Sequence, residues 1–76
     1  MCLSEAACVV EVEGDSAVVD LRGARRRVPL VMLTFAGEVI TAGDWLLLHT
    51  GLAVARISAT EAAEVNAIRH QGAPHA

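Results

Sequence analysis

CVVEVEGDSAVVDLRGARRRVPL, at residues 8–30, is the stretch that decides the fold. It is rich in β-branched residues and is interrupted by two turn-forming pairs, Gly14-Asp15 and Arg22-Gly23. Pro29 cannot donate to a β-ladder, which places the last strand at an edge or a bulge. Short strands separated by glycine turns predict a meander or a small barrel. The expected strands are residues 8–13, 17–21 and 25–30.

The middle of the chain is predicted to form a loop followed by two further strands. Residues 31–42 show no clear period, and a loop with a short turn near its start is expected there. Residues 45–49 read Trp-Leu-Leu-Leu-His, which predicts a strand buried on both faces. Gly51 interrupts this segment, and residues 52–57 predict the last strand.

A capping box marks the start of a helix. Ser58 and Glu61 have the required spacing, so that the hydroxyl and the carboxylate can each satisfy the other residue's amide. The apolar stripe of the helix needs a surface to cover, most simply the barrel. The sequence therefore predicts one domain over residues 1–76, mainly β, with a meander or small barrel at about 7–57, a C-terminal α-helix at about 59–70 and a flexible tail at 71–76. The expected stripe consists of Ala62, Val65 and Ile68.

The composition of the chain argues against several classes of function. The chain has 76 residues, 54% of them hydrophobic, and a net charge of −3. A nucleic-acid binder needs excess positive charge, and Phe35 and Trp45 are too few aromatic residues for a base-stacking platform. No stretch approaches the roughly 20 apolar residues that span a bilayer, and no signal peptide is recognisable at the start. The expectation is a cytoplasmic protein with reduced thiols that binds neither nucleic acid nor membrane.

No enzyme chemistry is indicated. Paired carboxylates, a glycine-rich phosphate loop and a Ser/His/Asp arrangement are missing at convincing spacing, and a chain this short has little room for a deep pocket. We expect a protein that binds partners and does not catalyse a reaction. Its functional end is expected at Met1-Cys2.

Cys2 is the sharpest candidate. Removal of the initiator Met would leave its thiol beside a free α-amine, whose charge lowers the thiol pKa below the usual value of about 8.5. A thiolate is a soft ligand suited to iron, copper or zinc. The alternative is an accidental surface thiol. Cys8 is expected as a small buried hydrophobe, with a second metal ligand or a disulfide to Cys2 as alternatives.

Other polar residues carry weaker signals. A lone His49 at the end of an apolar strand is more often a hydrogen-bonded structural residue than a ligand. The Arg25-Arg26-Arg27 run indicates a solvated face, with contact to a partner's acidic patch as the alternative. His70 and His75 receive no role.

The same residues resemble a known family, that of the HypC/HupF hydrogenase maturation chaperones. The likeness begins at Met1-Cys2-Leu3 and continues through Val10 to Asp20. It is strongest in GDWLLLHTGLA, residues 43–53, which resembles the family's Gly-Asp…His-x-Gly-x-Ala segment. The resemblance extends to about Arg69.

What the resemblance implies is an OB-like barrel with a C-terminal helix and a role in assembling nickel–iron hydrogenases. Such proteins pair with HypD while an iron centre acquires its cyanide and carbon monoxide ligands, and then accompany that iron to the hydrogenase large-subunit precursor. Carried over by position, Cys2 would be the essential thiol that contacts the iron or the protein partner. His49 would support the same site. The alternatives are an OB-type nucleic-acid-binding module and a small thiol redox protein using Cys2 and Cys8.

One segment departs from the family pattern. Family members usually continue Met-Cys-Leu with a small residue, an aliphatic residue and Pro-Gly, whereas this chain reads SEAAC at residues 4–8. Without Pro and Gly, Cys2 is expected on a looser arm. Glu5 is also expected to bring an acid close to the thiol, which would work against a thiolate.

Overall fold

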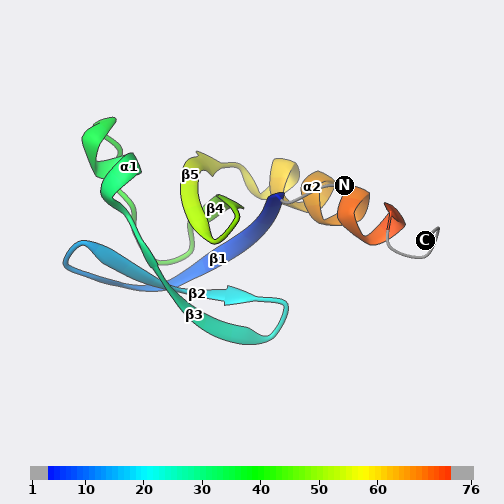
Figure 1. Ribbon diagram of the computed structural model, residues 1–76, viewed down its shortest axis with the longest axis horizontal. Helices are drawn as coiled ribbons and strands as arrows, with labels where there is room; N and C mark the ends of the chain where they lie inside the picture. The colour runs from blue at the N-terminus through cyan, green and yellow to red at the C-terminus, as the bar shows by residue number, and fades with distance from the viewer. Residues whose placement is uncertain (1–3, 73–76) are drawn as a thin grey trace.

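The computed structural model describes residues 4–72, with side chains to residue 67, as one curved sheet and two helices (Figure 1). The sheet carries α1 at one end and α2 at the other, and α2 extends away from it. The elements are β1 (Ser4–Glu13), β2 (Ser16–Leu21), β3 (Ala24–Pro29), α1 (Val31–Phe35), β4 (Trp45–His49), β5 (Leu52–Ile57) and α2 (Ala59–Gly72).

All strand pairings are antiparallel, in the order β3-β2-β1-β4-β5. β1 is the central strand: it pairs with β4 over Ser4–Cys8 and with β2 over Cys8–Glu13. The edge strands β3 and β5 contact each other, but no ladder joins them within the described residues. The mainly β fold with a C-terminal helix is confirmed, as is the edge position of Pro29. Closure into a barrel stays a prediction.

The core lies on the concave side of the curved sheet. Val19 and Leu46 are completely buried there, and Leu33 of α1 packs into the same cluster. The other side of the sheet is covered in part by α2, which contacts β1 and β4. Ala62 of α2 and Ala6 of β1 are both buried at this second contact. The small alanine side chains allow the helix to approach the strand closely.

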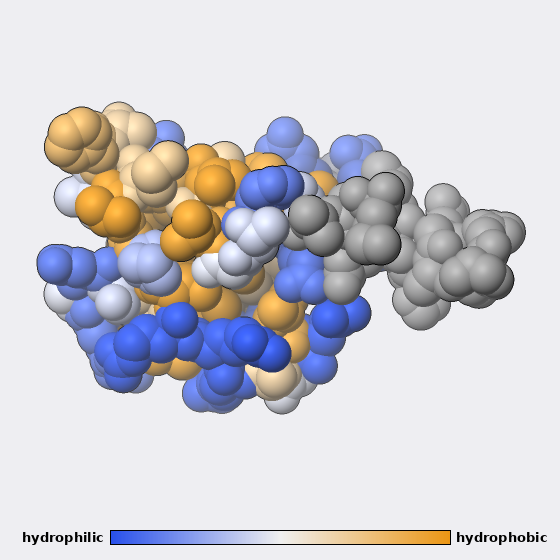
Figure 2. All heavy atoms as spheres, viewed as in Figure 1, coloured by the Kyte–Doolittle hydropathy of each residue, from blue (hydrophilic) through white to orange (hydrophobic). Residues whose placement is uncertain are grey.

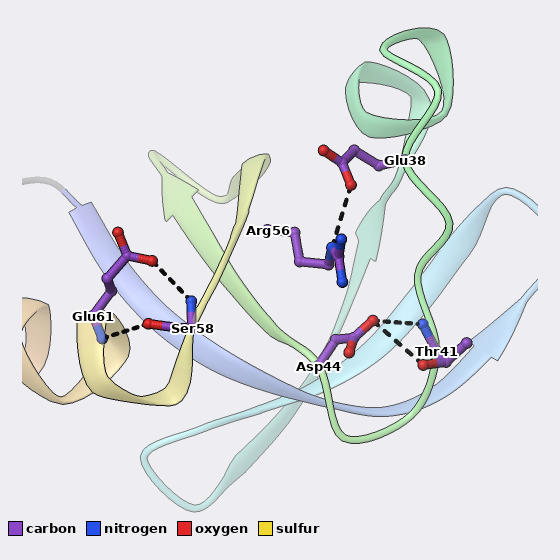
Figure 3. A network of polar contacts seen from close by, with 6 residues as sticks. All are labelled: Glu38, Thr41, Asp44, Arg56, Ser58 and Glu61. Atoms are coloured by element: carbon purple, nitrogen blue, oxygen red, sulfur yellow. Dashed lines mark hydrogen bonds and ion pairs between the residues drawn. The ribbon is translucent and has the colours of Figure 1, made fainter.

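Three polar pairs fix the connections between elements (Figure 3). The Asp44 carboxylate accepts hydrogen bonds from the backbone N–H and the hydroxyl of Thr41, at 2.9 and 3.3 Å. The second Gly-Asp pair is therefore a structural turn before β4, and its backbone exchanges hydrogen bonds with Val9 of β1. Glu38, after α1, forms an ion pair with Arg56 of β5. The third pair is Ser58 with Glu61.

The capping box is confirmed. The Ser58 hydroxyl accepts from the Glu61 amide at 3.0 Å, and the Glu61 carboxylate accepts from the Ser58 amide at 2.9 Å. The helix continues to Gly72, two residues beyond the expected end. Of its expected stripe, Ala62 is buried and Val65 is half-buried.

Other expectations need correction. β1 begins at Ser4 instead of Cys8, because Ala6 and Ala7 are small enough to be buried on opposite sides of the strand. Residues 31–35 form the short helix α1 where a loop was expected, because Leu33 anchors this segment in the core. β4 is not buried on both faces: Leu46 and Leu48 are buried, and the alternate residues are only half-buried or exposed because α2 covers them incompletely.

Candidate functional site

The candidate site is the end of the sheet where β1 begins and β4 turns into β5. The strand register places Ser4 opposite His49 and His49 opposite Leu52, so these side chains form one row across three strands. The row lies on the convex side of the sheet, because the neighbouring Leu48 is buried in the core. His49 and Leu52 are exposed to solvent. We call Ser4, His49 and Leu52 the His49 corner.

The His49 imidazole contacts the start of β1. Its Nδ1 lies 3.5 Å from the Ser4 hydroxyl oxygen, at the outer limit of a hydrogen bond, and the ring tautomer decides which of the two donates. Because His49 is exposed and this contact is long, the ring is available to a ligand or a partner. The His49 corner therefore combines an accessible imidazole with a hydroxyl and an exposed apolar side chain.

The turn that presents His49 has unfavourable backbone geometry. Thr50 and Gly51 both have positive φ, 51° and 87°, as a type I′ hairpin turn requires. Positive φ is rare for a β-branched residue such as Thr50. The Thr50 hydroxyl donates to the His49 carbonyl at 2.6 Å, which ties the strained residue to the residue it presents. Strain of this kind is concentrated at functional positions, which supports the choice of this corner.

A second contact holds the start of β1. The Asn66 side chain on α2 accepts a hydrogen bond from the Ala6 amide at 3.3 Å and donates to the Ala6 carbonyl at 3.5 Å. β2 pairs with β1 only from Cys8 onward, so Asn66 takes the place of a strand at Ala6. Residues 4–8 are thus an ordered strand and not part of a loose arm.

Glu5 lies on the opposite side of β1 from the His49 corner. Its register partner is the buried Leu48, and its carboxylate forms an ion pair with Arg22 at 3.4 Å. Within the described residues Glu5 thus lies on the other side of β1 from Ser4 and His49, and the expectation that it brings an acid close to the Cys2 thiol stays a prediction, because Cys2 lies outside those residues. The alternation of side chains along a strand explains this placement.

The structure describes only some of the predicted site residues. Cys2, the predicted iron-contacting thiol, lies outside the described residues, as does His75. Cys8 is half-buried beside its register partner Trp45, and its thiol makes a weak contact with the Val9 carbonyl at 3.8 Å. Between residues 4 and 72, no group of three or more His, Cys, Asp or Glu side chains is arranged to hold a metal.

The arginine run does not form one continuous cationic face. Arg26 is opposite the buried Val19 and so lies on the core-facing side of β3, whereas Arg25 and Arg27 lie on the other side. Arg27 forms an ion pair with Glu13. In the part of the chain that the structure describes, Arg25 and Arg26 have no ion pair.

Two features were missed by sequence reasoning. One is the Asn66 contact, which joins residues 60 positions apart and leaves no local pattern. The other is a set of exposed apolar side chains on and after α1, namely Val31, Met32, Phe35 and Val39. The apolar residues in this region were the available signal, because four large ones within a supposed loop need either a core or a partner. None of the helices within residues 4–72 has the length and apolar character to cross a membrane.

Comparison with known proteins gives a consistent result. The model of the HupF/HypC family matches residues 1–68. The chain is 38% identical over 65 residues to the hydrogenase maturation factor HypC of Helicobacter hepaticus, which covers 84% of this chain and 72% of that protein. It is 36% identical over 63 residues to the HypC of Cupriavidus necator, covering 82% of this chain and 66% of that protein.

Proposed function

This chain belongs to the HupF/HypC family, and on that premise we propose that it is a hydrogenase maturation chaperone acting by binding other proteins. Two relatives named as hydrogenase maturation factors support the general role. A small mainly β domain with an exposed site at one end is suited to such a role. The protein that supplies the cargo and the protein that receives it both need access to the same residues.

The finer proposal concerns partners and cargo. The chain pairs with a HypD-type maturation protein while an iron centre receives cyanide and carbon monoxide ligands, and then delivers that iron to the hydrogenase large-subunit precursor. The iron is cargo that passes through the protein. Cys2 supplies the thiolate that contacts the iron or the partner protein, and His49 assists it.

The observation that carries this proposal is the pairing of Ser4 with His49. Cys2 precedes Ser4 by two residues, and two residues of extended chain span at most about 7 Å. Paired residues of antiparallel strands have Cα atoms only about 4.5–5.5 Å apart. This short connection from Cys2 to Ser4 supports the proposal that the thiol and the His49 imidazole act together. A thiolate and a neutral imidazole are both good ligands for iron.

The accessibility of the His49 corner favours a site that transfers iron to another protein over a site that stores it. Structural metal sites are closed by a complete ligand set, whereas a site that exchanges its ligand keeps an open position. With one thiol and one exposed imidazole, this site would leave most coordination positions to the cargo's own ligands and to the receiving protein. Such a site releases its iron more readily than a complete protein cage would.

An anaerobic pull-down tests the proposal. A C-terminal tag leaves the N-terminus unmodified, and Cys2→Ala is compared with wild type and with Cys8→Ala as the matched thiol control. Wild type and Cys8→Ala should recover the HypD-type protein and the large-subunit precursor, and Cys2→Ala should recover neither. Equal recovery by all three variants would show that Cys2 is not the working residue, and failure of wild type to recover either protein would reject the proposed partners.

A further inference from the structure

The first half of β1 has a strand on only one side. β4 pairs with it over Ser4–Cys8, whereas β2 joins on the other side only from Cys8 onward. Two strands alone are at best marginally stable in water, so residues 4–7 need a further contact on their open side. A buried backbone amide or carbonyl there also needs a hydrogen-bond partner. Ala6 is buried, and Asn66 of α2 supplies both partners, at 3.3 and 3.5 Å.

Val9, farther along β1, has a comparable pair of hydrogen bonds. Its amide donates to the Asp44 carbonyl and its carbonyl accepts from the Gly43 amide, both at 2.8 Å. Backbone groups therefore satisfy Val9, whereas a side chain satisfies Ala6. A substitution leaves the backbone contact at Val9 in place, but the contact at Ala6 depends on the identity of residue 66.

α2 has few other means of holding the start of β1. Between residues 59 and 67, only Ala62 is buried, and Val65 and Asn66 are half-buried. Ala62 and Asn66 are four positions apart and therefore lie on the same face of the helix. In Figure 2 the apolar area lies over α1 and the adjoining sheet, away from the end of the molecule that carries α2. α2 therefore acts on β1 through a small alanine contact and one directional amide, and not through a broad apolar face.

The residue that Asn66 holds is two positions from the candidate site. Ser4 lies on the same side of β1 as Ala6, because strand side chains alternate, and Ser4 pairs with His49 of β4. The contact between the Ser4 hydroxyl and His49 Nδ1 is weak at its length of 3.5 Å. Local unfolding begins at weakly held strand ends, so loss of the Asn66 contact would free Ser4 from His49 before it affects the core.

We propose that Asn66 is a positioning residue of the site. By holding the Ala6 backbone, it keeps the start of β1 in register with His49 and thereby presents the residues before Ser4 to the HypD-type protein. Asn66 contacts neither the partner nor the iron, and it acts through Ala6 and Ser4. This inference rests on the proposed function and adds to it a residue of α2 that lies 60 positions from Ala6 in the sequence.

The test measures the affinity of the purified chain for the purified HypD-type protein under anaerobic conditions, at a temperature at which circular dichroism shows each variant to be folded. Asn66→Ala should bind about tenfold more weakly, because the freed residues must be ordered again on binding. Asn66→Asp keeps the size of the side chain and the acceptor for the Ala6 amide but cannot donate to the Ala6 carbonyl, and it should bind severalfold more weakly. This second variant decides the question if Asn66→Ala fails to fold. Ser58→Ala, which removes the helix cap without touching Ala6, and Glu64→Ala, on the exposed side of α2, are the matched controls and should bind like wild type.

A second measurement separates positioning from stability alone. If Asn66 acts through the Ser4–His49 pair, its loss should matter less once the His49 side chain has been removed. The affinity of the double variant Asn66→Ala/His49→Ala should therefore fall by less than the product of the two single losses. A purely structural role predicts wild-type affinity for Asn66→Ala whenever the chain is folded.

Each other outcome has a definite meaning. Wild-type affinity of folded Asn66→Ala and Asn66→Asp overturns the positioning role and leaves the proposed function standing. Equal weakening by Ser58→Ala assigns the effect to α2 as a whole and overturns the role of the Ala6 contact. Losses that multiply in the double variant show that Asn66 does not act through His49, which also overturns the proposal. If wild type binds no HypD-type protein, the proposed partnership fails and the positioning role fails with it.

Discussion

Asn66 on α2 makes two side-chain hydrogen bonds with the backbone of one residue, Ala6 on β1. Ala6 is almost completely buried, so its amide and carbonyl need partners inside the protein. A side-chain amide carries one donor group and one acceptor group and can therefore replace the peptide of a missing neighbouring strand. The contact fixes both the position of α2 and the first residues of the central strand.

Removal of this amide should destabilise the protein locally. Asn66→Ala leaves the buried Ala6 amide and carbonyl unsatisfied, which costs about 1–3 kcal/mol. Thermal unfolding should occur several degrees lower, since about 1 kcal/mol corresponds to about 4–8 °C in a domain of this size. Hydrogen exchange of the Ala6 amide should accelerate more than that of Leu46. Glu64→Ala on the exposed side of α2 is the control. An unchanged exchange rate at Ala6 would show that the Asn66 contact does not hold β1.

Substitution of Thr50 should stabilise the protein, whereas substitution of Asn66 should destabilise it. Asn tolerates positive φ better than a β-branched residue, and Asn-Gly is the preferred sequence for a type I′ turn. Thr50→Asn should therefore stabilise the fold by about 1 kcal/mol, measured by urea unfolding. Arg22→Asn, in the equivalent turn of the β2–β3 hairpin, should gain less because Arg is not β-branched. Loss of the Thr50 hydroxyl contact with His49 offsets part of the gain, so destabilisation by Thr50→Asn would mean that this contact dominates.

The cap of α2 should matter less than its contact with β1. Ser58→Ala removes the acceptor for the Glu61 amide and should cost about 1 kcal/mol. Thr60→Ala, one position inside the helix and exposed, is the matched control. The two variants are compared by their urea midpoints at constant slope. Equal midpoints would show that solvent replaces the Ser58 hydroxyl at this exposed helix end.

The sequence and the structure agree where local chemistry decides the conformation. Gly14-Asp15 and Arg22-Gly23 are turns, and the spacing of Ser58 and Glu61 marks the start of a helix. Each of these features depends on residues within four positions of one another. The agreement with the predicted strands at β2, β3, β4 and β5 has the same origin, because strand alternation is also a local pattern.

The sequence predictions and the structure differ where contacts between residues distant in the sequence determine the conformation. Alanines at positions 6 and 7 have low strand preference, and they are held in β1 by β4 and by Asn66. The α1 helix depends on Leu33 reaching a core made by other strands. At the site, His49 was a candidate because of the resemblance to the family, since the local pattern favoured a structural histidine, and its pairing with Ser4 comes from the β1–β4 register. Neither the register nor the side of β1 that Glu5 occupies could be read from the sequence without that pairing.

His49 should be needed for partner binding and not for folding. Its ring is exposed and its side-chain contact with Ser4 is long, so His49→Ala should change the free energy of unfolding by less than about 0.5 kcal/mol. If His49 assists Cys2, the same variant should recover markedly less of the HypD-type protein in the anaerobic pull-down. His49→Gln keeps a hydrogen-bonding side chain but is a poorer metal ligand. Recovery by His49→Gln at the wild-type level would therefore indicate a hydrogen-bonding role, and loss in both variants would indicate a ligand role. Leu52→Ala, the neighbour of His49 in the same row, tests whether apolar contact at this corner contributes. Wild-type recovery by His49→Ala, with stability also unchanged, would remove His49 from the site.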